Sequence, residues 1–243
     1  MIPYRQVFLP ALIVPLITLA ACGTDEAGAT TFVLTFSNIS SPGALPLSDG
    51  SATDVVYAPG AWAVFEEGGS LFSEGEAATE GLEELAEDGN NIPLVVAADD
   101  FPRVTAVGTY GQMDEGTYEE NPIGPGVSVD LEITGSPGQV LSFASMFVQS
   151  NDVFVAPAAG SIPLFDETGH ANSGDVTEQL AFFDTGTEVN EEPGLGANQA
   201  PRQSEAGAGV VETGTVTRFS GTDAAGFAYP ALNATFRLTI TAR

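Results

Sequence analysis

The chain is divided into short apolar or alternating runs that are separated by glycine, proline, asparagine and aspartate. Runs of this kind, when they are rich in β-branched and aromatic residues, are typical of strands joined by turns. We interpret as strands residues 31–36, 104–110, 127–133, 139–148, 161–165, 177–183, 210–219 and 231–241. Because their connections are rich in turn residues, these runs favour an antiparallel sandwich or barrel over alternating strand–helix units.

Residues 76–87 have the spacing of an amphipathic helix. Apolar residues recur there at helical intervals: Ala77, Leu82, Leu85 and Ala86. The sequence Asp88-Gly89-Asn90 follows and is typical of a helix end. The glutamates on the opposite side of this segment are most simply a solvated face.

Two further segments predict loops. Residues 55–65 carry Pro59 and Gly60 beside Trp62, which makes a poor strand and favours a packed loop. Residues 191–209 are rich in glycine, alanine and glutamate and predict a long loop. No repeat and no second apolar core divides residues 31–243, so we expect one domain there.

The N-terminus has the pattern of a bacterial lipoprotein signal. Arg5 precedes an almost wholly apolar stretch at 7–20, and small residues lead to Cys22, the only cysteine of the chain. We therefore expect residues 1–21 to be a signal peptide, Cys22 to be lipidated, and residues 22–30 to form a flexible tether. An ordinary cleaved signal peptide and an uncleaved anchor are the alternatives.

The charge balance excludes several classes of partner. The chain has 33 acidic and 6 basic residues, all of the latter arginine, and a net charge of −27. Nucleic acid binding requires a basic face, and attraction to anionic lipid headgroups requires the same. We therefore expect no nucleic acid partner and membrane contact only through the lipid on Cys22. Gly23 follows that cysteine, which favours the outer membrane if the organism is Gram-negative.

Three segments carry a family resemblance. They read SMFVQSNDVFVAP from Ser145, GDVTEQLAFFDTGTEVNEEPG from Gly174, and FAYPALNATFRLTI from Phe227. Together with the strand and helix before them, they resemble the spondin N-terminal domain of F-spondin, mindin and bacterial secreted proteins. The most telling piece is Asp-Thr-Gly-Thr-Glu from Asp184, where the family has Asp-Ala-Gly-Thr and an acid. The resemblance covers residues 31–243.

This resemblance implies a C2-like antiparallel β-sandwich with one short helix and a divalent cation, usually taken as calcium, near one edge. The family ligands map onto Glu132, Asp152 and Asp184. The cysteines of the animal domains are missing, so disulfide bracing is absent. No thrombospondin-type repeats follow, which leaves the animal guidance roles unsupported.

Physical chemistry favours the same acids. Calcium prefers several oxygen ligands, among them carboxylates. Glu132 alternates with apolar neighbours on a strand, Asp152 lies in a turn, and Asp184 ends an apolar run. Gly186 lets the backbone bend so that Glu188 approaches as a fourth ligand. Carboxylates this close would repel one another without a cation. The alternative is that each acid is an ordinary turn or edge residue in water.

Other chemistry has little support. One histidine and one cysteine cannot form a soft metal cluster, and His170 lies in a polar loop without a nucleophile motif. We expect a non-enzymatic adhesion or interaction module for an unknown extracellular or envelope macromolecule. The alternative is a calcium-dependent glycoside hydrolase or carbohydrate-binding module, which a deep groove with Trp62, Tyr57 or Tyr110 beside paired acids would favour. A passive envelope protein is a third reading.

Overall fold

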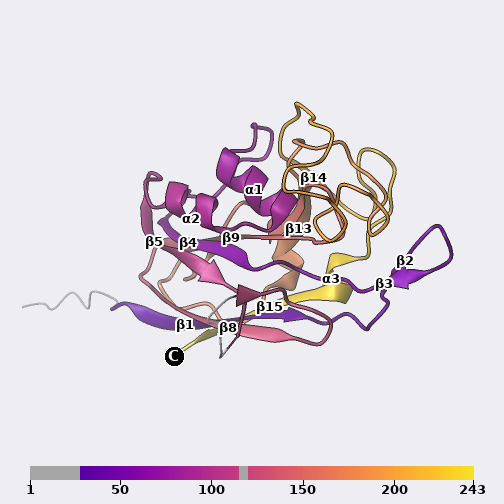
Figure 1. Cartoon of the computed structure of the whole chain (residues 1–243). Coiled ribbons are helices and arrows are strands. Elements are labelled where there is room, and N and C mark those ends of the chain that lie inside the picture. The colour runs from indigo at the N-terminus through magenta and orange to yellow at the C-terminus, as the bar shows by residue number, and fades with distance from the viewer. Residues whose placement is uncertain (1–27, 115–119) are drawn as a thin grey trace, which may run out of the picture.

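The computed structural model describes residues 28–114 and 120–243. In these residues the protein is mostly β, with large antiparallel sheets in a sandwich-like arrangement and a layer of helices outside it (Figure 1). The fold class expected from the sequence is therefore confirmed. The signal peptide, Cys22 and most of the expected tether lie outside the described residues.

One layer is a four-stranded antiparallel sheet. Its strands lie in the order β12 (Gly174–Asp175), β15 (Phe236–Ala242), β1 (Thr30–Asn38) and β8 (Ser128–Gly135). The last strand of the fold thus lies between β12 and the first strand, and β8 forms one edge. The expected strands at 31–36 and 127–133 are confirmed with small shifts of their ends.

The second layer is a seven-stranded sheet. Its main order is β14 (Thr217–Phe219), β13 (Leu180–Asp184), β10 (Val153–Pro157), β9 (Gln139–Met146), β4 (Gly60–Glu66) and β5 (Val104–Tyr110), with β11 (Ile162–Pro163) also paired to β9. Two small ribbons pair β2 (Leu45–Pro46) with β3 (Ala52–Thr53) and β6 (Gln112–Met113) with β7 (Glu120–Asn121). A 3₁₀ helix (Thr177–Gln179) and α3 (Leu232–Thr235) precede β13 and β15.

The main core lies between the two sheets. Phe32, Leu34 and Phe36 alternate along β1 and are fully buried against side chains of the larger sheet. The Phe36 ring stacks on Tyr110 of β5 with 3.9 Å between ring centroids. This alternation is what buries one face of a strand while the other stays polar, and it holds the two sheets face to face.

Helices α1 (Glu80–Asp88) and α2 (Ile92–Ala98) cover the other face of the larger sheet (Figure 1). The Thr79 side chain caps α1 by accepting from the backbone N–H of Leu82 at 3.3 Å, so the helix begins later than the spacing at 76–87 predicts. Gly89 ends α1 in the left-handed conformation, as the sequence indicates. No helix in the described part of the chain is long and apolar enough to cross a bilayer.

Several sequence expectations need correction. Residues 55–65 are not simply a packed loop, because they contain most of β4, an inner strand paired with β5 and β9. Ala61 and Ala63 pack under the helices, so the strand is buried on both faces and shows no alternation. The strand β10 escapes the sequence patterns for the same reason, and the helix α2 escapes them because it is apolar on its exposed side as well. Only Thr217–Phe219 of the run at 210–219 forms a strand, whereas the loop expected at 191–209 is confirmed.

Replacing Gly81 in α1 tests the contact between the two helices. A Cβ atom at this position would lie 2.7 Å from the backbone of Leu94 in α2. A glycine-to-alanine change inside an exposed helix normally stabilises it by about 1 kcal/mol. We expect Gly81→Ala instead to lower the free energy of unfolding by about 1–3 kcal/mol, because the helices must separate. Urea unfolding measures this, with Glu84→Ala on the same helix as the control, and a stabilised Gly81→Ala protein would refute the contact.

Candidate functional site

Asp152 is the centre of a buried polar cluster at one end of the larger sheet. It lies in the turn between β9 and β10, directly before the residue that pairs with Asp184 of β13. Its side chain is completely buried. The oxygen Oδ2 accepts hydrogen bonds from Thr185 Oγ1 at 2.9 Å and from the backbone N–H groups of Thr187 at 2.9 Å and Glu188 at 3.1 Å. The carboxyl group therefore ties the two turns together.

The other oxygen of Asp152 has no partner. Oδ1 is buried and forms no hydrogen bond with any residue that the structure describes. Burial, together with the charge of Asp184, raises the pKa of the Asp152 carboxyl to about 7. A buried acceptor without a donor destabilises the folded state, so a proton or a cation bound to this oxygen would be stabilising.

Asp184 lies at the end of β13 and has both oxygens engaged. Oδ1 accepts from the backbone N–H of Gly186 at 2.7 Å, and Oδ2 accepts from Asn190 Nδ2 at 2.6 Å. Gly186 has φ +70°, and a Cβ there would lie 2.9 Å from the backbone nitrogen of Thr215. The glycine of the Asp-Thr-Gly-Thr segment is thus required by both backbone conformation and space.

Further buried oxygens without partners adjoin this pair. They are Asp223 Oδ2, Asn190 Oδ1 and the Tyr229 hydroxyl. Burial raises the pKa of Asp223, and the Asp184 charge adds to this. Burial also raises the pKa of Tyr229, reinforced by the charges of Asp223, Asp152 and Asp184. No sequence pattern singles out Asp223 or Tyr229, because only the folded path of the chain after β14 brings them within the influence of the Asp184 charge.

Glu188 is buried beside the cluster, but its carboxylate is occupied elsewhere. Its Oε1 accepts from Gly209 N–H at 2.8 Å and its Oε2 from Asn151 Nδ2 at 3.3 Å. Burial raises the pKa of Glu188, and the charges of Asp88 and Glu191 raise it further. Only the backbone N–H of Glu188 contacts Asp152.

Glu87 at the end of α1 forms a second buried acidic group with Glu188. Its Oε1 is buried without a partner. Burial raises the pKa of Glu87 to about 7, a hydrogen bond with the Thr187 side chain opposes the shift, and the charge of Glu188 increases it. The end of α1 therefore meets the loop 185–216 through carboxyl groups that favour a proton.

The structure does not bring Glu132 to this cluster. Glu132 lies on β8, in the four-stranded sheet, and pairs in register with Val33. Its side chain is exposed and forms an ion pair of 3.6 Å with Arg243. The alternation in the sequence correctly places it opposite to its apolar neighbours, but that face is the outer face of the other sheet. The expected convergence of Glu132 with Asp152 and Asp184 is therefore wrong.

The carboxylates do not form a metal centre by themselves. Within residues 28–114 and 120–243, no group of three or more histidine, cysteine, aspartate or glutamate side chains is placed to hold a metal ion. Calcium sites, however, also use amide and backbone carbonyl oxygens and water. The neighbouring acids Asp152 and Asp184, with the amide oxygen of Asn190, have this hard-oxygen chemistry.

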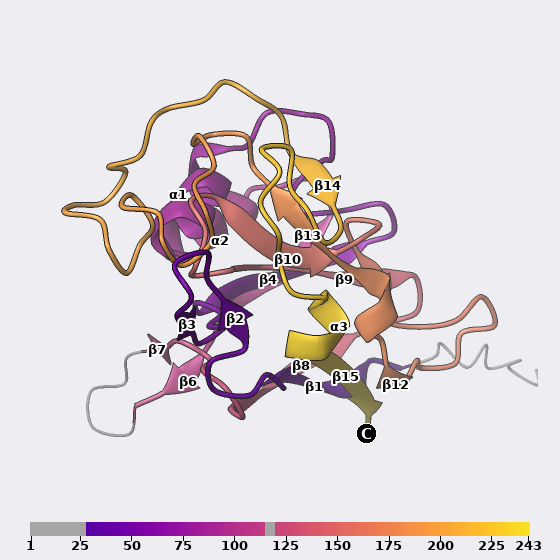
Figure 2. The same cartoon turned by 90° about the vertical axis from the view of Figure 1, so that its right-hand side faces the viewer.

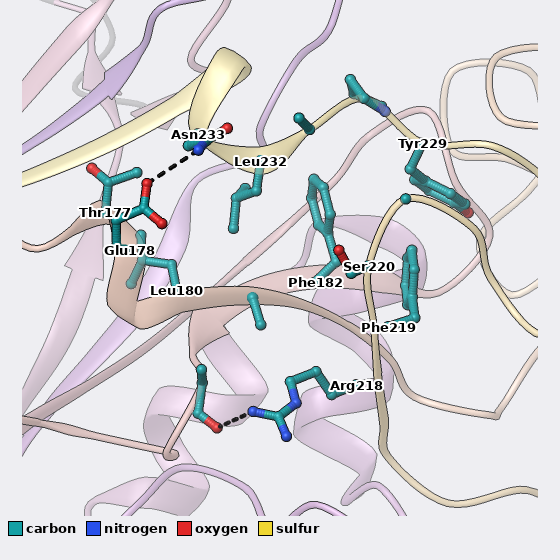
Figure 3. Close-up of a pocket in the computed structure, with 15 residues that line it drawn as sticks. Thr177, Glu178, Leu180, Phe182, Arg218, Phe219, Ser220, Tyr229, Leu232 and Asn233 are labelled. Atoms are coloured by element: carbon teal, nitrogen blue, oxygen red, sulfur yellow. Dashed lines mark hydrogen bonds between the residues drawn. The ribbon is translucent and has the colours of Figure 1, made fainter.

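Tyr229, which feels the charges of the acidic cluster, also lines a groove, and Figure 3 shows the residues of that groove. Its volume is about 820 Å³, and the rings of Phe182, Phe219 and Tyr229 line its apolar part. At one end Glu178 accepts from Asn233 Nδ2 at 3.1 Å, and at the other Arg218 Nη1 donates to the Ala158 carbonyl at 3.5 Å. The groove is thus amphipathic, with Tyr229 shared between it and the acidic cluster.

The aromatic residues that the sequence suggests for a groove lie elsewhere. Tyr57 and Tyr110 are buried in the core between the sheets, and Trp62 is half-buried and donates to the Thr109 carbonyl at 3.2 Å. His170 lies in an exposed loop beside Asp166, as expected. None of these four aromatic or imidazole side chains lines the groove.

Comparison with known protein families finds no family that matches the chain, and no curated protein matches it significantly. The resemblance to the spondin N-terminal domain therefore stays a prediction from the segments quoted above. The fold and the cluster around Asp152 are the observations on which a function must be built.

The raised pKa values predict how stability depends on pH. The folded pKa values of Asp152 and Glu87 lie above their ordinary values of 3.8 and 4.5, so the folded state binds these protons more tightly than the unfolded state. This contribution is complete below pH 4 and is lost as the pH rises through about 7. In buffer with chelator, we expect the melting temperature to fall between pH 5 and pH 8.

The variant Asp152→Asn separates this effect from general repulsion in an acidic chain. It keeps an acceptor oxygen but does not titrate, so the fall in melting temperature should be smaller than in the wild type. Exposed Asp130→Asn is the matched control and should retain the full fall. Identical pH profiles for the wild type and Asp152→Asn would contradict the assignment.

Proposed function

We propose that this protein is an exported, lipid-anchored domain of the spondin type that holds a structural calcium ion and serves as an interaction module. The signal pattern ending at Cys22 supports export and acylation. The acidic surface and the all-β fold are compatible with a cell-envelope module. The role is non-enzymatic.

One observation carries the cation proposal. Asp152 is completely buried, its Oδ1 has no partner among the described residues, and burial together with the charge of Asp184 raises its pKa. A buried carboxylate next to another carboxylate is destabilising at neutral pH unless a cation neutralises the pair. Calcium would supply that charge and satisfy the free oxygen.

The ligand set differs from the one expected from the sequence. Asp152 and Asp184 remain, Glu132 is left out, and no third carboxylate replaces it, because no group of three acids among the described residues is placed to hold a metal ion. The amide oxygen of Asn190, backbone carbonyls and water would complete an oxygen shell. The Glu188 carboxylate is left out because it already accepts two hydrogen bonds.

The ion's role would be to fix the loop surface. The residues around Asp152 and Asp184 start or end the turns that lead into the loop 185–216, which has no named strand or helix. A cation that binds only the folded state would lock these turns and shape the loop for contact with a macromolecule.

Thermal melting with calcium and with chelator tests the proposal. A ligand at a hundredfold excess over its Kd stabilises the folded state by about 2.7 kcal/mol, which corresponds to roughly 5–10 °C for a domain of this size. We expect such a rise with calcium. Asp184→Asn should remove most of it, because the change removes a ligand charge.

Glu132→Gln is the matched control in this experiment. It removes one exposed carboxylate from the other sheet, so the calcium-dependent rise should be unchanged. An unchanged melting temperature of the wild type, together with no bound metal by elemental analysis, would reject the cation site. Loss of the rise in Glu132→Gln would reject the revised ligand set.

A carbohydrate-binding module is the second candidate, and the amphipathic groove favours it. Aromatic rings beside hydrogen-bonding side chains suit the two faces of a sugar ring. Glycoside hydrolysis normally needs two carboxyl groups across the scissile bond, whereas Glu178 is the single carboxylate among the described residues that line the groove. Of the two alternative functions, the lining of the groove therefore favours a carbohydrate-binding module over a glycoside hydrolase.

Affinity electrophoresis in gels that contain soluble polysaccharides tests this candidate. We expect retardation by one of them to be lost in Phe219→Ala, because Phe219 is the half-buried ring of the groove. The exposed Val96→Ala on α2 should be retarded like the wild type. Equal mobility of the wild type in all gels would remove the second candidate.

A further inference from the structure

A second cavity lies on the other side of Phe219, over Asp184. Its volume is about 600 Å³. The residues that matter for its chemistry are Asp184, Glu212, Val189, Val211, Phe219 and Ala225. This cavity is therefore lined by both carboxylate groups and apolar side chains. We call it the valine pocket, after Val189 and Val211.

The rim of the valine pocket continues into an exposed apolar patch. Val211 is 82 % exposed, Val210 62 % and Val189 45 %. These residues come from two segments of the loop 185–216 that are held together by a hydrogen bond of 2.8 Å from Val189 N to the Val210 carbonyl. Neighbouring large apolar side chains at this exposure are typical of a surface that a partner covers.

The charged groups of the pocket accept hydrogen bonds and do not donate them. The two oxygens of Asp184 each accept one internal hydrogen bond, which leaves acceptor capacity on a carboxylate with about four lone-pair sites. Glu212 is exposed at the rim and adds a second carboxylate. A lysine side chain matches this arrangement, because it places three donors on an apolar four-carbon stem.

The surroundings of the pocket select a protein as the source of that lysine. A free amine would fill the recess but leave Val210 and the outer side of Val211 exposed, whereas apolar residues beside a lysine would cover them. A second copy of this chain cannot supply the group, because the sequence contains no lysine. Anionic partners are repelled by a net charge of −27.

We propose that the valine pocket is a docking site for a lysine side chain of a partner protein, with apolar residues of that partner packing on Val189, Val210 and Val211. The inference rests on the proposed role as an interaction module and names the chemistry of its partner. It concerns the calcium-free form, because Asp184 is also a proposed calcium ligand and a bound ion would compete with the lysine for its carboxylate.

Titration of a blocked peptide, Ala-Val-Lys-Val-Ala, into the ¹⁵N-labelled protein tests the proposal. The buffer contains chelator and about 0.15 M salt, where the Debye length of about 8 Å suppresses non-specific attraction to the acidic surface. We expect saturable shifts of the amide signals of residues 186–190 and 211–217. The same peptide with acetylated lysine should bind at least about tenfold more weakly, because the charge-assisted hydrogen bonds are lost.

Two variants locate the site on the protein. Val189→Ser combined with Val211→Ser should weaken binding of the lysine peptide about tenfold or more, because two apolar contacts are lost. Val96→Ser changes an equally exposed valine on α2 and should bind like the wild type. Equal affinity for the lysine and acetyl-lysine peptides, shifts located elsewhere, or no shifts at millimolar peptide would overturn the proposal. The calcium-dependent melting shift of the same proteins reports separately on the cation site.

Discussion

The hydrogen bonds of the buried Asp152 carboxyl group hold together the turns at this end of the larger sheet. One oxygen gathers a hydroxyl and two backbone N–H groups from the segment that follows β13, and the other oxygen is buried without a partner. The hydrogen bonds to the first oxygen fix the direction in which the chain leaves the sheet. The second oxygen has no donor, and because burial and the charge of Asp184 act on the same carboxyl group, a proton or a cation would stabilise it. The same side chain therefore orders the turns and is the central ligand of the proposed calcium site.

The packing of several elements buries the Asp152 side chain. The four-stranded sheet, with the last strand beside the first, closes the core from one side, and α1 and α2 close the larger sheet from the other (Figures 1 and 2). The loop 185–216 lies beside the end of α1, where Gln203 donates to Asp88 at 2.6 Å. Burial is thus imposed on the acids by the packing of several elements, which is why their pKa values rise.

Sequence patterns predict those strands and helices of this fold that have one solvent-exposed face and one buried face. The alternation in β1 and β8 and the spacing in α1 are readable because polar and apolar sides differ. The strands β4 and β10 are buried on both faces and the helix α2 is apolar almost all round, so no period distinguishes them. The proximity of Asp152 to Asp184 agrees with what the family resemblance implies for these two residues. The exclusion of Glu132 could not be predicted, because it depends on which sheet the strand β8 joins.

The most direct measurement is a crystal structure of the protein grown with calcium and then soaked with manganese, using the anomalous signal to locate the ion. We expect one anomalous peak at bonding distance from Asp152 Oδ1, with calcium–oxygen distances of about 2.3–2.6 Å in the unsoaked crystal. Density for a water or a protein donor at Asp152 Oδ1, with no anomalous peak between Asp152 and Asp184, would contradict it.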